Sequence, residues 1–443
     1  MCSKNHNKSV NIKLACTTVL DAELVTRCSR CGKCRSVCPV FEELRAEPYV
    51  ARGKVQLYKA LLNGTLEATE KYRELISFCL LCGRCTENCP NGVNTGEIVL
   101  RARNKLVDSR GLPFIKRNVF QHLLKNNGRL TWAAGMLHIY QRWGLQSLVR
   151  KTGLLPGPLK DREQLLPVMA DKPLRSQLPA VINPPGRVRV KAGYFTGCLS
   201  QYIYTETGKN VANILTRAGA QVVIPEQYCC GMPALTAGDK VNALALARMN
   251  VAAFSAAGVD VVITDCATCG SALYSKYPEL LGEDLPFKVM DICQFLAQWG
   301  TGAEQLNSAN ARAATLQNDI AGTVQNTPVV PGHASVSVTY HDPCHLARYM
   351  QVREEPRTLL RGIPGMEFTE MSQPDRCCGA SGSFQLEHQE LAARIGEHKI
   401  KSILATGARV VATGCPSCRL QLARLLQASN AGIAVVHPVD LLI

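Results

Sequence analysis

Apolar side chains in the first third of this 443-residue chain recur every three or four residues. That spacing puts them on one face of a helix, so it predicts amphipathic helices rather than strands. The clearest helices are expected at 50–62, which Gly64 can terminate, and at 96–107. A third stretch, 118–150, sets aromatic and aliphatic residues at helical spacing among Lys and Arg, and it predicts further amphipathic helices.

Beyond residue 189 the pattern changes to short continuous apolar runs, each followed by a helical stretch. Such alternation predicts parallel strands joined by helices. Strands are expected at 190–196, 221–225, 259–264, 335–341, 367–371 and 409–413, and helices at 204–218 and 239–257. The sequence thus predicts a helical N-terminal part followed by an α/β part.

Cysteines mark the α/β part as an internal duplication. Each copy has a single cysteine, then an adjacent pair followed by glycine, then a Cys-x-x-Cys. The single cysteine and the pair are separated by 30 residues in the first copy and 32 in the second, and the pair and the last motif by 35 and 36. The first copy contains Cys198, Cys229, Cys230, Cys266 and Cys269, and the second contains Cys344, Cys377, Cys378, Cys415 and Cys418.

Five thiols gathered from three loops suit an iron-sulfur cluster better than zinc, which closes with four tetrahedral ligands. The loops follow the carboxyl ends of predicted strands, where open α/β sheets bind ligands. Gly231 and Gly379 permit a sharp bend after each pair, because glycine tolerates φ > 0. A vicinal disulfide or buried structural cysteines could explain one copy. The same spacing in two copies favours a metal site.

Two further cysteine runs lie in the helical part, each of the form Cys-x-x-Cys-x-x-Cys-x-x-x-Cys-Pro. Three thiolates at this spacing can hold one corner of a 4Fe-4S cubane, and the fourth, followed by proline, binds the other cluster when two runs are present. A zinc ribbon would use two separated pairs instead. We therefore assign one cluster to Cys28, Cys31, Cys34 and Cys89, and a second to Cys79, Cys82, Cys85 and Cys38.

These motifs take 18 of the 21 cysteines and leave Cys2, Cys16 and Cys293. Metal ligation needs free thiolates, which favours a reducing compartment such as the cytoplasm. No apolar run has the length of a signal peptide or of a membrane span.

The net charge of +15 is concentrated in residues 101–191, which carry 18 Lys and Arg against four acids. Amphipathic helices with such charge and interfacial aromatics can lie on the anionic inner face of the cytoplasmic membrane. A helical hairpin with an ordinary solvated basic face is the alternative. No groove-reading or base-stacking motif accompanies the charge, so nucleic acid is not expected as a partner.

The patterns divide the chain into six parts. We expect a flexible lead-in at 1–20, an α-helical ferredoxin domain with two 4Fe-4S clusters at 21–108, a basic helical segment and Pro-rich linker at 109–188, a first cysteine-rich repeat at 189–300, a linker at 301–334, and a second repeat at 335–443.

With two four-cysteine runs ahead of two Cys-Cys-Gly repeats, the chain resembles iron-sulfur subunits of the glycolate oxidase type. It is also similar to the anaerobic glycerol-3-phosphate dehydrogenase iron-sulfur subunit and to cysteine-rich subunits of heterodisulfide reductase. The specific matches are Arg52-Gly53-Lys54-Val55, Cys89-Pro90-Asn91-Gly92-Val93, Tyr340-His341-Asp342-Pro343-Cys344-His345 and Cys377-Cys378-Gly379-Ala380-Ser381-Gly382.

The resemblance implies an electron-transfer subunit. In that family an FAD subunit oxidises a 2-hydroxy acid such as glycolate or lactate, and the iron-sulfur subunit passes the electrons on, usually to a membrane quinone. In heterodisulfide reductase relatives the full repeat holds a non-cubane 4Fe-4S cluster, which implies one or two further clusters here. Both final cysteine pairs are intact, whereas glycolate oxidase subunits often lack a member. A lactate-oxidising relative or a thiol-disulfide reductase therefore stays open.

No nucleophile elbow, phosphate-cradling loop or dinucleotide fingerprint is present, so we expect no catalytic residue in this chain and hydride chemistry on a partner's cofactor. His341 and His345 flank Cys344 and are candidates for a proton relay or for a hydrogen bond to a cluster. Histidines in such loops are more often satisfied by ordinary hydrogen bonds. Asp265 and Asp342 precede ligand cysteines and are expected to cap the following turns.

Overall fold

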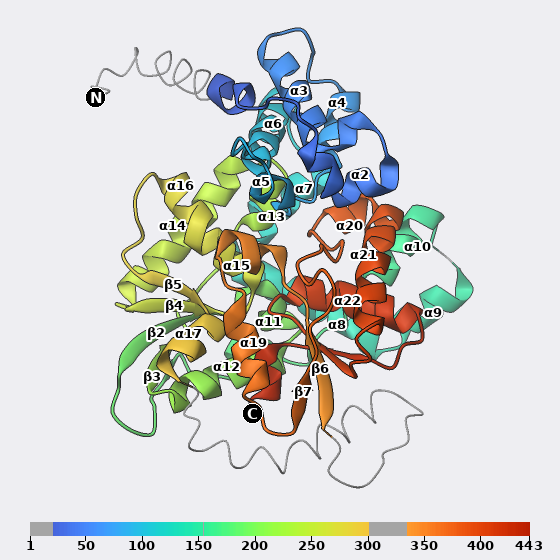
Figure 1. Cartoon of the computed structure of the whole chain (residues 1–443). Helices are drawn as coiled ribbons and strands as arrows, with labels where there is room; N and C mark the ends of the chain where they lie inside the picture. Colours follow the sequence, from blue (N-terminus) through green and yellow to red (C-terminus); the bar gives the residue numbers. More distant parts are fainter. Residues whose placement is uncertain (1–20, 154, 301–334) are drawn as a thin grey trace, which may run out of the picture.

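The computed structural model describes residues 21–153, 155–300 and 335–443 (Figure 1). The predicted lead-in at 1–20 and the predicted linker at 301–334 lie outside the described residues.

Helices make up the N-terminal part, which caps one end of the molecule in Figure 1. Their termini follow from local chemistry: the Thr69 hydroxyl accepts from the Tyr72 amide and the Asn94 side chain from the Glu97 amide, which satisfies donors that a first helical turn leaves unpaired. The buried side chains of Val55, Tyr58 and Ile98 form the core here. The elements are η1 (Lys33–Ser36), α2 (Pro39–Leu44), η2 (Glu47–Tyr49), α3 (Ala51–Leu62), α4 (Glu70–Ser77), α5 (Arg84–Glu87) and α6 (Thr95–Arg110).

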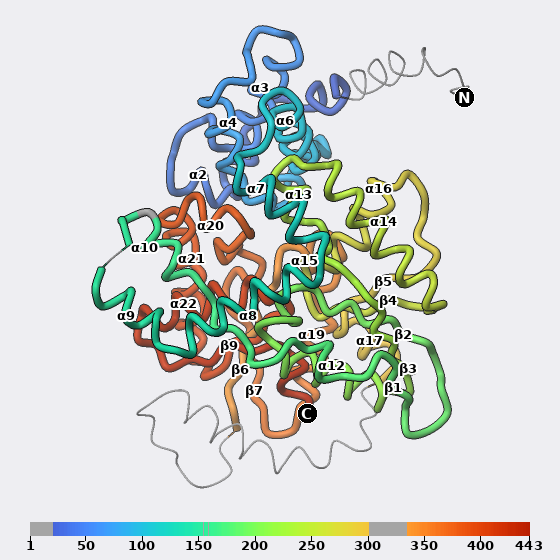
Figure 2. Tube along the Cα trace, turned by 180° about the vertical axis from the view of Figure 1, so that it is seen from behind, coloured from blue at the N-terminus to red at the C-terminus, as the bar shows by residue number. Residues whose placement is uncertain are grey.

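The basic segment follows as helices on the face seen in Figure 2. They are α7 (Phe114–Asn118), the π-helical turn η3 (Val119–Leu123), α8 (Asn127–Arg142), α9 (Leu145–Thr152) and α10 (Gly157–Gln164). The helices predicted across 118–150 are thereby confirmed. Within the described residues no helix combines the length and the apolar character that crossing a membrane requires.

The Pro-rich stretch is not a plain linker. It contains η4 (Leu174–Ser176) and β1 (Val181–Ile182), and β1 adds an antiparallel edge strand beside β3. Leu174 is fully buried and lies so close to Gly208 that a Cβ there would be 2.2 Å from its Cδ2 atom. The linker interpretation was wrong for 174–182, because proline content does not reveal which single apolar side chain the core receives.

Each repeat forms its own sheet. The first has β2 (Val190–Phe195), β3 (Ala220–Val223), β4 (Val261–Thr264) and β5 (Lys288–Asp291) in the order β1-β3-β2-β4-β5. The second has β6 (Val336–Tyr340), β7 (Met366–Phe368), β8 (Val410–Ala412) and β9 (Ala434–Val436) in the order β7-β6-β8-β9. Apart from β1 all neighbours are parallel.

The register repeats as well as the order. Ala192 of β2 pairs with β3 and β4 at Val222 and Val261, just as Val338 of β6 pairs with β7 and β8 at Phe368 and Val410. This confirms the internal duplication and the predicted fold class of an α part followed by two α/β repeats. Strands β5 and β9 were not predicted, and β7 ends at Phe368, three residues before the end of the strand expected at 367–371.

Helices connect the strands within each repeat and form the contacts between the two repeats. In the first repeat they are α11 (Gly197–Tyr202), α12 (Thr205–Arg217), α13 (Met232–Thr236), α14 (Lys240–Ala256), α15 (Ala267–Ser271), the π-helical turn η5 (Ala272–Lys276), α16 (Tyr277–Leu281) and α17 (Ile292–Trp299). In the second they are the π-helical turn η7 (His345–Tyr349), α19 (Glu354–Arg361), α20 (Phe384–Glu387), α21 (Gln389–Leu404), α22 (Pro416–Ala428) and η8 (Pro438–Leu441).

The repeats pack through equivalent elements. Helix α12 contacts η8 while α17 contacts α19, and α11 contacts α22 while α15 contacts η7. Each contact has a counterpart with the two repeats exchanged, so a pseudo-two-fold axis relates them. Their inward faces share one apolar core that contains Ala192, Ile263, Val338 and Val410.

Gly53 on α3 offers a test of the packing. A Cβ at this position would lie 1.9 Å from the Glu47 carbonyl oxygen, and backbone cannot move aside as a flexible side chain can. We expect Gly53→Ala to lower the free energy of unfolding by about 1–3 kcal/mol. Gly135→Ala on α8, where a Cβ meets nothing within 4 Å, should instead raise it by about 0.5–1 kcal/mol. Anaerobic urea unfolding measures both, and equal effects would contradict the packing described.

Candidate metal centres

The two N-terminal cysteine runs fold into the same loop. Gly32 and Gly83 have φ of 85° and 75°, and the residues before the second cysteine of each run, Arg30 and Leu81, have φ of 61° and 53°. Non-glycine residues adopt this left-handed conformation only at a cost. The same strained turn in both runs folds each triplet of thiols around one point.

The fourth cysteine of each run crosses to the other loop. One cavity of about 30 Å³ is lined by the thiol-bearing residues Cys28, Cys31, Cys34, Cys85 and Cys89. A second, also about 30 Å³, is lined by Cys38, Cys79, Cys82 and Cys85. This is the arrangement that the crossed ligand sets require.

The Arg-Gly-Lys motif on α3 directs one cation to each loop. Arg52 donates from Nη1 to the Arg30 carbonyl at 3.1 Å and pairs with Glu47. Lys54 is 2% exposed and donates from Nζ to the Tyr49 carbonyl at 2.7 Å. Burial lowers the pKa of Lys54, while the nearby Cys79 and Cys38 raise it. The motif thus places a buried positive charge beside the second cavity.

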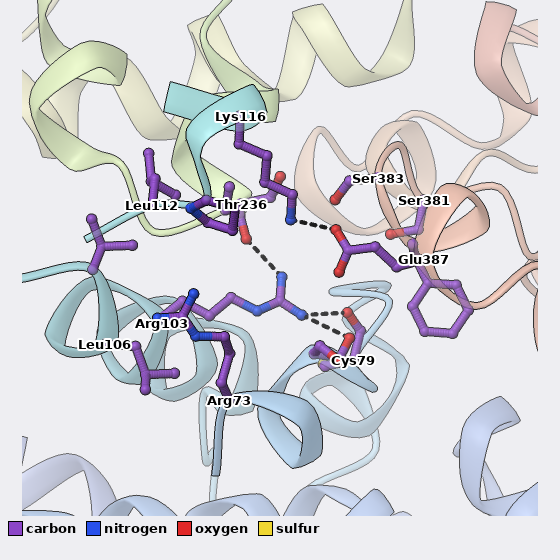
Figure 3. A pocket seen from close by; sticks show the side chains of 15 residues that line it. Arg73, Cys79, Arg103, Leu106, Leu112, Lys116, Thr236, Ser381, Ser383 and Glu387 are labelled. Atoms are coloured by element: carbon purple, nitrogen blue, oxygen red, sulfur yellow. Dashed lines mark hydrogen bonds and ion pairs between the residues drawn. The ribbon is translucent and has the colours of Figure 1, made fainter. Parts of the chain in front are cut away.

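A second cation, the half-buried Arg103 on α6, ties this loop to the first repeat (Figure 3). Its guanidinium donates to the carbonyls of Cys79 at 2.9 Å and Thr236 at 2.7 Å. It lines a cavity of about 100 Å³ in which Lys116 pairs with Glu387. The Arg103 guanidinium therefore anchors the loop that carries Cys79 through hydrogen bonds to backbone carbonyls.

The ten repeat cysteines converge on one cavity of about 130 Å³. In each sheet the strand order reverses between two neighbours, β2 with β4 and β6 with β8, and ligands bind beyond the carboxyl ends of such strands. Cys198 and Cys266 follow the first pair, and Cys344 and Cys415 follow the second. The pseudo-two-fold packing turns these two edges toward each other. Thr268 Oγ1 of the first repeat is 3.6 Å from Cys415 Sγ of the second.

The second N-terminal loop docks on the second repeat. Ser381 donates from its hydroxyl to the Leu80 carbonyl at 2.7 Å, and the Tyr349 hydroxyl donates to the Leu81 carbonyl at 2.9 Å. Cys82 and Cys377 share one buried cluster. Burial, followed by the neighbouring Cys377, raises the pKa of the Cys82 thiol.

The donor set fits iron-sulfur clusters. Within the described residues every cysteine is a free thiol, so a vicinal disulfide at Cys229 and Cys230 is excluded. Burial raises the pKa of Cys85 to about 12, so the thiol releases its proton only when a metal ion or a nearby cation stabilises the thiolate. Soft thiolates at this density select iron-sulfur clusters or zinc, and more than four thiols in one cavity favour the former.

Comparison with known proteins finds three family models along the chain. A 4Fe-4S dicluster domain model matches residues 24–93, a cysteine-rich domain model matches 192–274 and 338–423, and the linker region of the glycolate oxidase iron-sulfur subunit matches 111–166. A probable glycolate oxidase iron-sulfur subunit of Bacillus subtilis is 32% identical over 96% of this chain and 94% of the relative. The chain belongs to the glycolate oxidase iron-sulfur subunit family.

Other relatives extend this family. A dihydromethanophenazine:CoB–CoM heterodisulfide reductase subunit of Methanosarcina barkeri is 29% identical over 94% of this chain and 92% of its own. Lactate utilization protein A of Bacillus pumilus is 28% identical over 57% of this chain and 99% of its own. The predicted resemblance is confirmed, and so is the predicted class of cofactor, several 4Fe-4S clusters. Which thiols bind them stays a prediction.

Asp265 and Asp342, which precede repeat cysteines, do not have the capping role expected from the sequence. Asp342 does not cap a turn, since both its oxygens accept from buried Arg357 at 2.9 and 2.8 Å. Asp265 accepts from the Ser200 hydroxyl at 2.6 Å, and burial raises its pKa to about 7. The capping interpretation was wrong, because both carboxylates anchor neighbouring helices instead.

The two histidines that flank Cys344 differ in their hydrogen bonding. His345 meets the Ser271 hydroxyl at 2.6 Å and stacks on Tyr349, as expected of a satisfied loop residue. His341 is 1% exposed, and neither ring nitrogen has a hydrogen-bond partner among the described residues. Burial, and then the charge of Lys399, lower the pKa of His341 to about 3. Its ring is therefore neutral at ordinary pH.

The repeats carry different charges at equivalent positions. The glycines after the cysteine pairs, Gly231 and Gly379, face the carbonyls of Ala243 and Ala392, which aligns Asn250 on α14 with Lys399 on α21. Asn250 is neutral and donates to the Cys229 carbonyl at 3.1 Å. Lys399 is fully buried and donates to the carbonyls of Gln373 and Pro374, and burial lowers its pKa to about 8.

Sequence reasoning found the thiols but missed the buried cations. Lys54 had a signal in the Arg-Gly-Lys motif, although no role was attached to it. Arg103 and Lys399 lie on amphipathic helices where a single Lys or Arg ordinarily faces solvent. Only the tertiary packing reveals that Lys399 is buried, and Arg103 half-buried, beside cysteine loops.

Lys54 should set the reduction potential of the second N-terminal centre. We expect Lys54→Met to lower that potential by roughly 70–140 mV, because a unit charge about 5–10 Å away contributes about 2–3 kcal/mol at an effective dielectric constant near 20. Potentiometric titration followed by EPR measures the shift. Lys71→Met, which removes an exposed charge on α4, is the control. An equal shift in both variants would contradict a local effect of Lys54.

Proposed function

We propose that this chain is the iron-sulfur electron-transfer subunit of an FAD-dependent dehydrogenase of 2-hydroxy acids, with glycolate or lactate as the substrate. The observation that carries the proposal is the continuity of the thiol-lined cavities. Cys85 lines both N-terminal cavities, Cys82 lies against Cys377, and the repeat cysteines share one further cavity. Such a series suits the passage of electrons through the chain rather than reaction at one point.

In this proposal the cysteines hold the carriers. Bound clusters would supply one-electron carriers. Cys28, Cys31, Cys34 and Cys89 hold the first, Cys38, Cys79, Cys82 and Cys85 hold the second, and the ten repeat cysteines hold one or two more. Cys31 is exposed, so we place the entry of electrons at the first centre. The positive charges of Lys54 and Arg103 stabilise the more negative, reduced state of the second centre. The Leu80–Cys82 loop connects this centre to the second repeat.

Substrate oxidation belongs to a partner. The relatives named glycolate oxidase iron-sulfur subunit and lactate utilization protein A support a flavoprotein partner and a 2-hydroxy acid. Oxidising the acid to a 2-oxo acid releases two electrons and two protons. The flavin accepts the pair as a hydride equivalent and this subunit then carries the electrons singly.

The relay can be tested with the partner flavoprotein present. Adding lactate or glycolate anaerobically should reduce the clusters of this subunit, as followed by EPR. In Cys82→Ser the first centre should still become reduced while the repeat centres stay oxidised, because Cys82 belongs to the connecting centre. Cys293→Ser, at a buried thiol outside the cavities, should behave as wild type.

Two results would contradict the relay. One is the absence of cluster reduction with either acid. The other is efficient reduction of a disulfide by the isolated subunit with a viologen donor, which would favour the heterodisulfide reductase-like alternative.

The acceptor side of the proposal involves a membrane. Helix α8 presents Trp132, Met136, Ile139 and Trp143 at intervals of three and four, and all are exposed, the two tryptophans at 70% and 75%. An apolar helix face that points outward, with Arg129 beside it, matches the surface of an anionic bilayer. Figure 2 shows α7 and α8 on one face of the molecule.

This face suggests where a quinone could meet the chain. The cavity in Figure 3 lies between Cys79 and the start of the basic segment at Leu112 and Lys116. Phe114 and Ile115, next to it, are more than two-thirds exposed. Thr236 and Ser381 line both this cavity and the cavity of the repeat cysteines. We therefore place the quinone headgroup in this cavity, where it accepts electrons from the repeat centres, at the inner face of the cytoplasmic membrane.

Vesicle binding tests the membrane contact. Replacing Trp132 and Trp143 by Gln together should weaken binding to vesicles with anionic lipid at least tenfold, because each buried aromatic contributes about 1.5–3 kcal/mol. Val241→Gln, at a 77% exposed apolar residue on α14, is the control. Cosedimentation measures both. Unchanged vesicle binding with loss of the flavoprotein complex would assign the face to the partner instead.

A further inference from the structure

His341 is the feature that the relay leaves unexplained. It follows β6 directly, and its backbone amide donates to the Ala412 carbonyl at 3.0 Å, which fixes its position between β6 and β8. The side chain is 1% exposed and has no hydrogen-bond partner for either ring nitrogen among the described residues. A buried polar group left without a partner costs about 1–3 kcal/mol. Such a cost calls for an occupant that the protein atoms do not provide.

The ring faces two of the repeat thiols. One ring nitrogen of His341, Cys378 Sγ and Cys418 Sγ all lie within 4.8 Å of one another, and all three residues are buried. Tetrahedral ligands of one metal ion lie about 3.5–3.8 Å apart, since metal-sulfur and metal-nitrogen bonds measure about 2.3 and 2.0 Å. The three atoms are therefore close enough for a small side-chain movement to bring them onto one ion.

The first repeat shows that the fold does not require histidine here. Cys344 corresponds to Cys198, and β6 corresponds to β2 in register, so His341 corresponds to Phe195. Phe195 is fully buried and packs on Phe254 with ring centroids 5.9 Å apart. A hydrocarbon ring thus fills the same position in the other copy, and the imidazole is specific to the second.

We propose that His341 is a nitrogen ligand of the metal centre in the second repeat, which is then held by sulfur and nitrogen, whereas the first repeat offers sulfur alone. The inference rests on the proposed function, which assigns iron to the second repeat. Neutral imidazole is a common ligand of iron.

The donor set has an electronic consequence. A neutral nitrogen ligand adds no negative charge to an iron-sulfur centre, as a thiolate in its place would, and therefore makes the centre easier to reduce. The buried charge of Lys399 acts in the same direction at this repeat, where the first repeat has Asn250. The second repeat should therefore accept electrons before the first, in keeping with its contact with the Leu80–Cys82 loop.

Isotope labelling tests the ligand directly. The full-length iron-loaded protein is prepared with ¹⁵N-histidine and with natural histidine, and pulsed EPR is recorded on the repeat signals. We expect a nitrogen coupling of the size of a metal-bonded imidazole that changes with the isotope. His341→Phe, which copies the first repeat, should abolish the coupling, and His345→Phe should retain it. If His341→Phe does not fold, His341→Cys keeps a ligand, and it should lose the coupling and shift the potential of the signal to more negative values.

Two outcomes separate the possible failures. A repeat signal that shows no histidine coupling, or only the weak coupling of a hydrogen-bonded nitrogen, overturns the ligand role of His341. Iron content that is unchanged in a Cys415→Ser/Cys418→Ser double variant shows instead that the second repeat holds no iron, which overturns the assignment on which the inference rests.

Discussion

The structure depends on bringing many thiols into small spaces that lack water. Burial raises the pKa of the Cys82 and Cys85 thiols, and thiolates gathered at low dielectric repel one another. Lys54 and Lys399 are buried and Arg103 is half-buried, and all three have carbonyl rather than carboxylate partners among the described residues. Their charges are thus free to act on the cysteine loops. These cations and the metal together neutralise the thiolates, so folding and cluster assembly are coupled.

Ion pairs of a buried arginine hold the N-terminal part against the second repeat. Arg348 on η7 is almost fully buried, and it donates from Nε to Glu87 at 2.8 Å while also pairing with Asp375. Its Nη1 reaches the Cys82 carbonyl at 3.5 Å. Breaking this network would leave a charge buried without a partner, which is strongly unfavourable. A fixed separation between the second centre and the repeats follows, as electron transfer over a defined distance requires.

Much of this could be predicted because cysteine spacing is a local signal and buried parallel strands are continuous apolar runs. The strands that deliver Cys198 and Cys266 were found for that reason. Strand β5 was not, since Lys288 and Asp291 interrupt its apolar character, and β9 has only three residues. The unpartnered ring of His341 and the burial of Lys399 depend on which helices pack together. No local pattern contains that information.

The pseudo-two-fold axis between the repeats has an evolutionary meaning. Two separate copies around such an axis would form an isologous dimer, in which every substitution appears at both sites. Here both copies belong to one polypeptide, so each position can mutate alone. Phe195 opposite His341 and Asn250 opposite Lys399 are differences that a symmetric dimer could not have acquired. Joining the two copies in one chain thus released the halves from having to remain identical, and differences between their thiol-lined sites became accessible to selection.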